Sequence, residues 1–261
     1  MSASLSEALK VQGRVIGALM LRDMRTRFGR TFMGYVIIVG WPLAHLLVLM
    51  AIFLATRRVA PVGTSVPVFL GTGVLPYILC LYPGRMIMLC LVQNQPLLLF
   101  PIVKTTDVIL ARGLLEILTA CWVTVIFALL LYICGVDIAP IHYHEAIQAI
   151  LATMYLAFAI GFIGAVLYKL VRAWLGVQIG FLILLYITAG VFFIPTNVPE
   201  DLQFYLWFNP LLHCVEWLRS AYYDGYGYGM LSQGYLISFS TLLLAIGLVI
   251  ERFVRGRLLQ G

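Results

Sequence analysis

Charged residues are scarce in this chain of 261 residues: Asp, Glu, Lys and Arg together make up 11% of it, whereas 62% is hydrophobic. A soluble globular domain usually contains about 25% charged residues. So few charges do not cover a water-facing surface of this size, and the apolar residues are gathered in long runs. The composition excludes an ordinary soluble protein and predicts an all-α integral membrane protein, because helices satisfy their own backbone hydrogen bonds in lipid.

Patterns that would indicate a metal or cofactor are also missing. The five cysteines form no Cys-x-x-Cys pair and no cluster with histidine. His142 and His144 fall on different faces of a helix, and only Glu145 is near them. The glycines of residues 224–230 lack the Lys-Ser/Thr of a phosphate-binding loop. We therefore expect no catalytic residue, no metal site and no cofactor bound by this chain.

The start of the chain lacks the short apolar core and cleavage site of a signal peptide, so no cleavable leader is expected. The apolar runs instead predict six transmembrane helices, since crossing the hydrocarbon core takes about 20 apolar residues. These spans cover residues 34–55, 66–91, 109–134, 146–168, 174–194 and 231–250. Three prolines and Arg85 interrupt the second span, where we expect a kinked or broken helix. The transmembrane domain is residues 33–255, and a tail of residues 256–261 follows it.

The distribution of basic residues predicts the orientation. Thirteen of them lie before the first span, after the last span, and around the connections between spans 2 and 3 and between spans 4 and 5. The opposite side has Arg57, Arg58 and Arg219. Because Lys and Arg concentrate on the cytoplasmic side, both termini are expected in the cytoplasm. This orientation explains the net charge of +6 better than nucleic-acid binding does.

Residues 1–32, with a helix over about 6–28, are expected to form a basic amphipathic helix at the membrane surface. Leu9 and Ile16 share one sector of this helix, and Lys10 and Arg14 share another. Such a helix is either a docking surface for a cytoplasmic partner or a simple anchor, and the sequence leaves both open.

The connection between spans 2 and 3, residues 93–107, is cytoplasmic by the charge count. It is mildly apolar, and Pro96 and Pro101 interrupt it, which fits a short helix across the membrane face. Exposed leucine and phenylalanine in such a connection indicate a protein partner. The alternative is a loop packed on its own helices.

The external connection, residues 195–230, is rich in aromatic residues. Its apolar stretch, Phe204–Leu218, is too short to cross the bilayer and predicts a re-entrant segment between spans 5 and 6. The rings form either a belt at the headgroup level or a lining for sugar, because the apolar face of a pyranose stacks on aromatic rings.

Arg85 lies within the second predicted span. A charge at mid-bilayer costs about 2.5–3.5 kcal/mol on insertion scales. We expect Arg85 to face the bundle interior or a water-filled path, near a carboxylate or an anionic substrate. In the alternative, the span ends earlier and the side chain only extends to the headgroups.

Several separated motifs, taken in order, resemble the membrane subunits of ABC-2 type exporters, most closely the capsular polysaccharide export permeases of Gram-negative bacteria. The match covers about residues 20–255. It is carried by Arg22-Asp-Met-Arg-Thr-Arg-Phe-Gly-Arg30, Gly34-Tyr, Trp41-Pro42, Gly71–Tyr77, Pro101-Ile-Val-Lys104, Gly190-Val-Phe-Phe-Ile-Pro195 and Asn209-Pro-Leu-Leu-His213.

The resemblance implies a homodimer in the inner membrane with two cytoplasmic ATPase subunits, which bind ATP and Mg. It also implies a lipid-linked polysaccharide as substrate, with a periplasmic co-polymerase and an outer-membrane export protein as further partners. Residues that would transmit the ATPase motion are Asn94, Gln95, Leu97, Leu98, Phe100, Lys104 and Asp107. Residues that would contact the polysaccharide are Arg85, Tyr82, Tyr77, Trp207, Phe208, His213, Trp217, Arg219, Tyr222 and Tyr223.

Three alternatives remain open. An O-antigen or teichoic-acid permease of the same superfamily would differ only in cargo. A membrane glycosyltransferase would need a carboxylate pair at the membrane face, and the candidates Asp107 and Glu116, nine residues apart with basic neighbours, fit poorly. An ion-coupled transporter would need acidic residues within the spans, and none is expected to lie clearly there.

Overall fold

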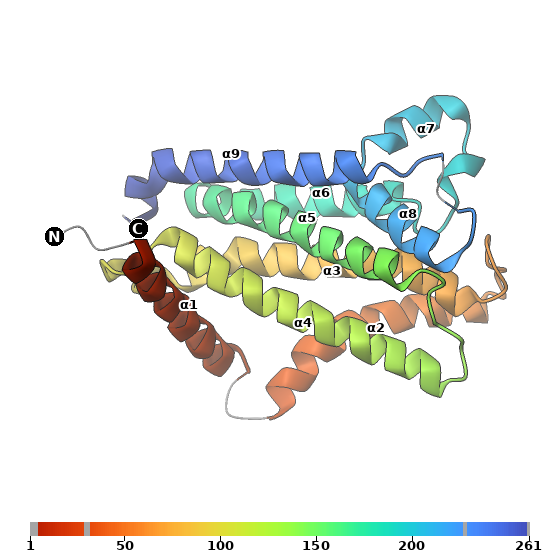
Figure 1. Ribbon diagram of the computed structural model, residues 1–261, viewed down its shortest axis with the longest axis horizontal. Helices are drawn as coiled ribbons and strands as arrows, with labels where there is room; N and C mark the ends of the chain where they lie inside the picture. The colour runs from red at the N-terminus through yellow and green to blue at the C-terminus, as the bar shows by residue number, and fades with distance from the viewer. Residues whose placement is uncertain (1–4, 29–31, 227–228, 260–261) are drawn as a thin grey trace.

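The computed structural model describes residues 5–28, 32–226 and 229–259. All regular secondary structure in these ranges is helical (Figure 1). Five helices are long and apolar enough to cross a membrane: α2 (Phe32–Ala55), α3 (Val66–Gln93), α4 (Thr105–Ile133), α5 (Tyr143–Leu170) and α9 (Gln233–Leu259). These bounds confirm an all-α protein with several apolar helices, which the long apolar runs predicted.

α6 (Trp174–Thr188) is shorter than the predicted span. Its 15 residues extend about 22 Å, less than the roughly 30 Å of a hydrocarbon core. The helix ends because Gly190 has a φ of +73°, in the left-handed region that commonly terminates helices. The last part of the predicted span, residues 189–194, is therefore not helical.

α3 is the central helix of the bundle, and it packs against α2, α4, α5 and α8 (Pro210–Tyr222). Residues 68–80 are all buried. Pro76 and Pro83 lie inside α3, and the helix continues through both. Of the kinked or broken helix expected here, the break is absent, although each proline removes one N–H donor.

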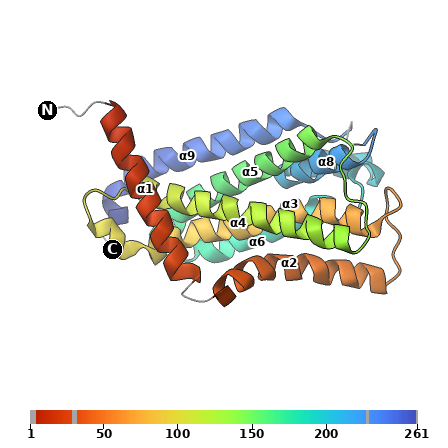
Figure 2. The same cartoon turned by 60° about the horizontal axis from the view of Figure 1, so that its bottom comes forward.

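The long helices run side by side, so that the molecule has two ends, and α1 crosses the bundle obliquely at one of them (Figures 1 and 2). The first, called the α1 end below, carries α1 (Leu5–Phe28), the 3-10 helix η1 (Gln95–Leu99) and the C-terminal end of α9. The opposite one, called the α8 end, carries the α2–α3 and α4–α5 connections, α7 (Glu200–Trp207) and α8. The first and last helices therefore meet at the same end.

A separate apolar cluster holds the α1 end together. Its buried members include Leu19 of α1, Leu98 of η1, Ile109 of α4 and Leu258 of α9. These side chains come from four helices, of which α1 and α9 are the first and the last. Their burial fixes α1 and the α3–α4 connection on the bundle, in addition to the polar contacts described below.

Candidate functional site

A cavity of about 550 Å³ lies between α2, α3 and α4, next to the C-terminal part of α1. Toward the α1 end its lining is polar, with Gln93, Arg112 and Glu116. Farther from that end its lining is apolar, with Ile78 and Val123. The cavity therefore has a charged region near the α1 end and an apolar region farther from it.

Two residues predicted to contact the substrate, Arg85 and Tyr82, line this cavity. Arg85 is exposed, and within the described ranges its guanidinium makes no hydrogen bond or ion pair. The hydroxyl of Tyr82 lies 3.3 Å from Nδ1 of His45. Trp41 of α2 lines the same cavity. The result is an unpaired cation beside polarisable rings.

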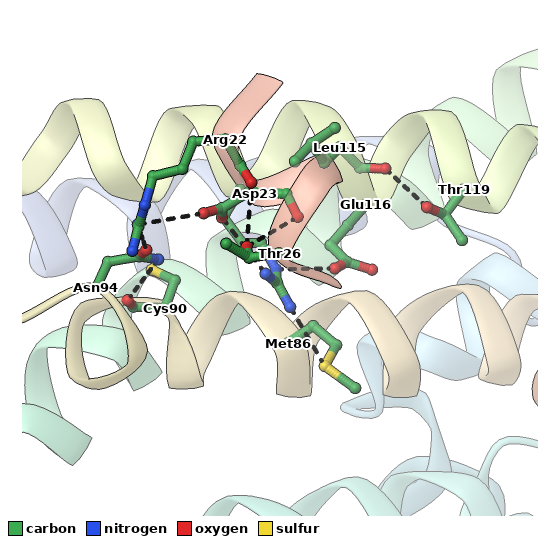
Figure 3. A network of polar contacts seen from close by, with 10 residues as sticks. Arg22, Asp23, Thr26, Met86, Cys90, Asn94, Leu115, Glu116 and Thr119 are labelled. Atoms are coloured by element: carbon green, nitrogen blue, oxygen red, sulfur yellow. Dashed lines mark hydrogen bonds and ion pairs between the residues drawn. The ribbon is translucent and has the colours of Figure 1, made fainter. Parts of the chain in front are cut away.

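A buried charge network beside the cavity joins α1 to α4 (Figure 3). Nη1 of Arg112 lies 3.4 Å from Oδ2 of Asp23, and Nε of Arg112 lies 3.0 Å from Oε1 of Glu116. Nη2 of Arg112 lies 3.5 Å from the sulfur of Met86 on α3. The three charged residues are buried, which is tolerable because each charge has an opposite partner.

A second polar contact of α1 reaches the end of α3. Nη1 of Arg22 donates a hydrogen bond to Oδ1 of Asn94 and lies 3.8 Å from Oδ1 of Asp23. Nδ2 of Asn94 donates to the carbonyl of Cys90 at 3.1 Å, closing the last turn of α3. Asn94, which the sequence predicts to transmit ATPase motion, therefore links α1 to the end of α3 through its side-chain amide (Figure 3).

Sequence reasoning missed the charge network. Arg112 and Glu116 are four residues apart, the spacing at which a helix brings opposite charges together, so a signal was present. The expectation that no acidic residue lies clearly within a span was wrong, since Glu116 lies inside α4. Because Arg112 compensates its charge, Glu116 alone does not indicate ion coupling.

The α3–α4 connection is also held at its exit, at the start of α4. Nε2 of Gln12 on α1 donates to Oδ1 of Asp107 at 2.9 Å. The backbone N–H of Lys104 donates to Oδ2 of Asp107 at 3.2 Å. The hydroxyl of Thr105 donates to Oε1 of Glu251 on α9. Three helices, α1, α4 and α9, therefore converge on this short stretch.

Between these anchors the connection exposes apolar side chains. Leu99, Phe100 and Ile102 have 75%, 58% and 62% of their surfaces exposed. The residues predicted to couple to an ATPase divide by exposure: Asn94, Leu98 and Asp107 are buried, Gln95 and Leu97 are half-buried, and Phe100 and Lys104 are exposed. The connection thus combines a fixed base with a protruding apolar tip.

At the α8 end, Arg219 of α8 is fully buried. Its Nη1 donates to the carbonyl of Gly190 and its Nη2 to the carbonyl of Val191, both at 2.7 Å. The guanidinium carbon lies 4.2 Å from the ring centre of Phe69 on α3. A Cβ on Gly73 would come within 2.8 Å of Nη2, so glycine makes room there. Arg219 thus satisfies carbonyls just beyond the end of α6.

Three other predicted substrate contacts hold the short helices together. Nε2 of His213 lies 2.8 Å from the carbonyl oxygen of Trp207. The backbone N–H of Ser232 donates to Nδ1 of His213 at 3.1 Å, so the tautomer with hydrogen on Nε2 satisfies both contacts. Nε1 of Trp217 donates to Oε2 of Glu145 on α5. Both ring nitrogens of His213 and Nε1 of Trp217 are thus engaged within the protein, and Trp207 contributes its backbone carbonyl.

The remaining predicted residues of this region are more accessible. Phe208 is exposed. Tyr222 and Tyr223 are half-buried and line a second cavity, of about 690 Å³, together with the α2–α3 and α4–α5 connections. In the residues that the structure describes, no group of three or more His, Cys, Asp or Glu is placed to hold a metal.

Tyr77 belongs to a series of rings along α2, α3 and the end of α6. Its ring stacks on Tyr186 with centroids 3.8 Å apart. Tyr186 meets Phe192 at 5.4 Å, and Phe192 stacks on Phe53 at 5.6 Å. On the other side, Tyr77 meets His45 at 6.1 Å. The series therefore connects the neighbourhood of the cavity with the α8 end.

Comparison with known proteins decides the family. Over 244 residues, which are 93% of this chain and 94% of the relative, the sequence is 32% identical to the polysialic acid transport protein KpsM of Escherichia coli. The chain belongs to the capsular polysaccharide export permease family. The permease is also 28% identical over 262 residues to the capsule polysaccharide export inner-membrane protein CtrC of Neisseria meningitidis. It is 26% identical over 256 residues to BexB of Haemophilus influenzae. No protein-family model matches it.

These relatives confirm the resemblance inferred from the motifs. They are transport and inner-membrane proteins by name, so the permease is a membrane transport subunit of the inner membrane rather than an enzyme. The contacts agree with this conclusion, because Asp107 and Glu116, the carboxylates that a glycosyltransferase would need, are buried against Gln12 and Arg112.

Proposed function

We propose that the permease is the membrane subunit of an ATP-driven exporter that moves lipid-linked capsular polysaccharide across the inner membrane. The observation that carries this proposal is the 32% identity over 93% of the chain to a polysialic acid transport protein. Two cytoplasmic ATPase subunits bind ATP and Mg, and this chain binds no cofactor. Capsule is favoured over O-antigen or teichoic acid because the relatives are named for capsule or polysialic acid.

In this proposal the chain crosses the membrane six times with the α1 end in the cytoplasm. The fifth span consists of α6 together with the non-helical residues 189–194, which Arg219 bonds. α1 lies at the membrane surface, and its basic residues agree with this side. The segment with α7 and α8 leaves and rejoins the bundle at the α8 end, which supports a re-entrant segment (Figure 1).

Two copies of the permease form the path for the polysaccharide. The half-buried rings of Phe53, Tyr186 and Phe192 support a route along α2 and the end of α6, whereas Tyr77 is buried beneath Tyr186. Aromatic faces suit the apolar C–H face of a pyranose, and such contacts tolerate sliding because no single hydrogen bond fixes the sugar. Beyond the membrane, a periplasmic co-polymerase and an outer-membrane export protein continue the route.

The ATPase docks on the α3–α4 connection. An exposed apolar tip at Leu99, Phe100 and Ile102 is the kind of surface that a protein partner covers. Its base is bonded to α1 through Asn94 and Asp107. Motion of the ATPase at the tip therefore moves α1, α3 and α4 together. In this way the motion reaches the helices around the cavity.

The docking is tested with Phe100→Asp in the complex with the partner ATPase. An apolar anchor at an interface contributes about 2 kcal/mol or more, so co-purification should weaken about 30-fold and export should stop. The matched control is Phe204→Asp, a similarly exposed phenylalanine (63%) at the α8 end, which should leave ATPase binding unchanged. Full ATPase binding by the Phe100 variant would exclude this connection as the docking site.

A further inference from the structure

We propose that the cavity between α2, α3 and α4 binds an anionic phosphoglycerolipid of the cytoplasmic leaflet. Its phosphate pairs with Arg85, and one acyl chain lies in the apolar part of the cavity. The inference uses the orientation proposed above and adds to it a site for a membrane lipid on the permease itself.

Charge is the first reason. Around the cavity, Arg22 and Arg112 are matched by the carboxylates of Asp23 and Glu116. One positive charge, that of Arg85, is left without a hydrogen bond or ion pair in the described part of the chain. A charge in an apolar helix is costly unless it meets an anion. A phosphate accepts the two parallel N–H bonds that a guanidinium offers.

Depth is the second reason. Arg85 lies eight residues before the end of α3 at Gln93, which is about 12 Å along the axis. The 28 residues of α3 are about 42 Å long, so a centred helix extends about 6 Å beyond each face of a 30 Å core. The Arg85 backbone then lies about 6 Å below the hydrocarbon surface. Its long side chain reaches the level of the lipid phosphates.

The lining is the third reason. Toward the bilayer centre the cavity has Ile38, Pro42, Ile78 and Val123, whereas its polar residues lie toward the α1 end. A glycerolipid has the same order, headgroup first and acyl chain deeper. The volume of about 550 Å³ is within the roughly 300–1,000 Å³ of known ligand sites. Basic pockets between transmembrane helices on the cytoplasmic side recur as headgroup sites.

Exposed Trp41 of α2 marks the place where a lipid would enter the cavity. Trp41 lines it with 69% of its surface exposed, and tryptophan is preferred at the boundary between headgroups and acyl chains. A small water-soluble anion would pair with Arg85 but leave the apolar wall uncovered. A lipid satisfies both parts, which is why it is the occupant inferred here.

The test measures lipids retained by the purified full-length permease in detergent, by native mass spectrometry after incubation with phosphatidylglycerol or phosphatidylcholine. Wild type should retain phosphatidylglycerol in preference. Arg85→Gln should retain about tenfold less, since a charge-assisted hydrogen bond contributes about 1.5 kcal/mol or more. Arg85→Lys should keep part of the binding. The matched control is Arg172→Gln, an exposed arginine at the α1 end outside the cavity, which should behave as wild type.

A second variant tests the acyl-chain part. Ile38→Trp fills the cavity from half-buried Ile38 and should lower retention while Arg85 is intact. Equal retention by Arg85→Gln and wild type, or no preference between the two lipids, overturns the proposal. Displacement of the lipid by inorganic phosphate alone would reduce the site to an anion site and also overturn it. ATPase and polysaccharide are absent from the assay. A negative result would therefore contradict the lipid site and leave the proposed transport function untouched.

Discussion

At the scale of single residues, Arg219 shows how one buried charge can end a helix. Its guanidinium donates to the carbonyls of Gly190 and Val191 at 2.7 Å and to that of Phe193 at 3.3 Å. These carbonyls follow α6, where no further helical N–H is available to them. The arginine therefore replaces a missing turn of helix and ties that turn to α8.

We expect Arg219→Met to destabilise the protein strongly, since it leaves at least two buried carbonyls without donors. Each costs about 1–3 kcal/mol, so the loss is about 3 kcal/mol and the Tm should fall by about 6–12 °C. Thermal unfolding of the purified protein in detergent measures it. Arg58→Met, which removes an exposed arginine over Phe53 at the same end, should change the Tm little. Equal Tm values for the two variants would contradict the role of Arg219 in satisfying the carbonyls after α6.

Arg219 also marks a limit of sequence reasoning. An arginine in an aromatic external connection predicts a polysaccharide contact, and that role stays a prediction. Its carbonyl partners lie 28 and 29 residues earlier in the sequence, and no local pattern reveals a pair so far apart. The i, i+4 pair Arg112 and Glu116 was, by contrast, within reach of a local rule.

At the scale of elements, α1 is bound to the bundle rather than merely resting against it. It contacts α3 through Arg22 and α4 through both Gln12 and Asp23. Two of these contacts meet the two ends of the α3–α4 connection, Asn94 and Asp107. A force on that connection therefore acts directly on α1. The helix can then be both an anchor at the membrane surface and part of the region that responds to a docked partner.

We predict that Arg112→Met loosens α1, because it leaves Asp23 and Glu116 buried without their shared counterion. Breaking a buried pair in this way costs about 3–5 kcal/mol. Limited proteolysis of the permease in nanodiscs should then cleave within α1 at far lower protease concentrations than in wild type. The control is Arg14→Met, which removes an exposed arginine of α1 and should leave the cleavage pattern as it is. Protection equal to wild type in Arg112→Met would contradict the role of the network.

Four of the five long helices begin and end within four residues of the predicted spans, because long apolar runs and their polar ends are local properties. The last predicted span ended at residue 250, whereas α9 continues to Leu259. The third predicted span began at residue 109, whereas α4 begins at Thr105, since Asp107 accepts from the Lys104 N–H and so caps the helix start. The end of α6 was not predictable from hydropathy. It depends on the backbone of Gly190 and on Arg219, which a hydropathy pattern does not register.

At the scale of the whole molecule, the two ends have different chemistry. The α1 end has the cationic cavity and the apolar tip of the α3–α4 connection, and the α8 end has short helices with aromatic side chains. Rings from His45 to Phe53 connect the two regions. The sequence predicted Arg85 and Tyr82 as site residues, and they share the cavity. That α1 and α4 would close one side of it requires the three-dimensional packing.

We propose that this chain moves a finished polysaccharide and does not make it. The most direct measurement is the amount and location of capsular polysaccharide in cells that lack this chain, with the ATPase subunit and all other components present. We predict that the polymer is still made, accumulates in the cytoplasm and disappears from the cell surface, and that the wild-type gene restores surface polymer. Loss of the polymer altogether, or unchanged polymer at the surface, would contradict the account.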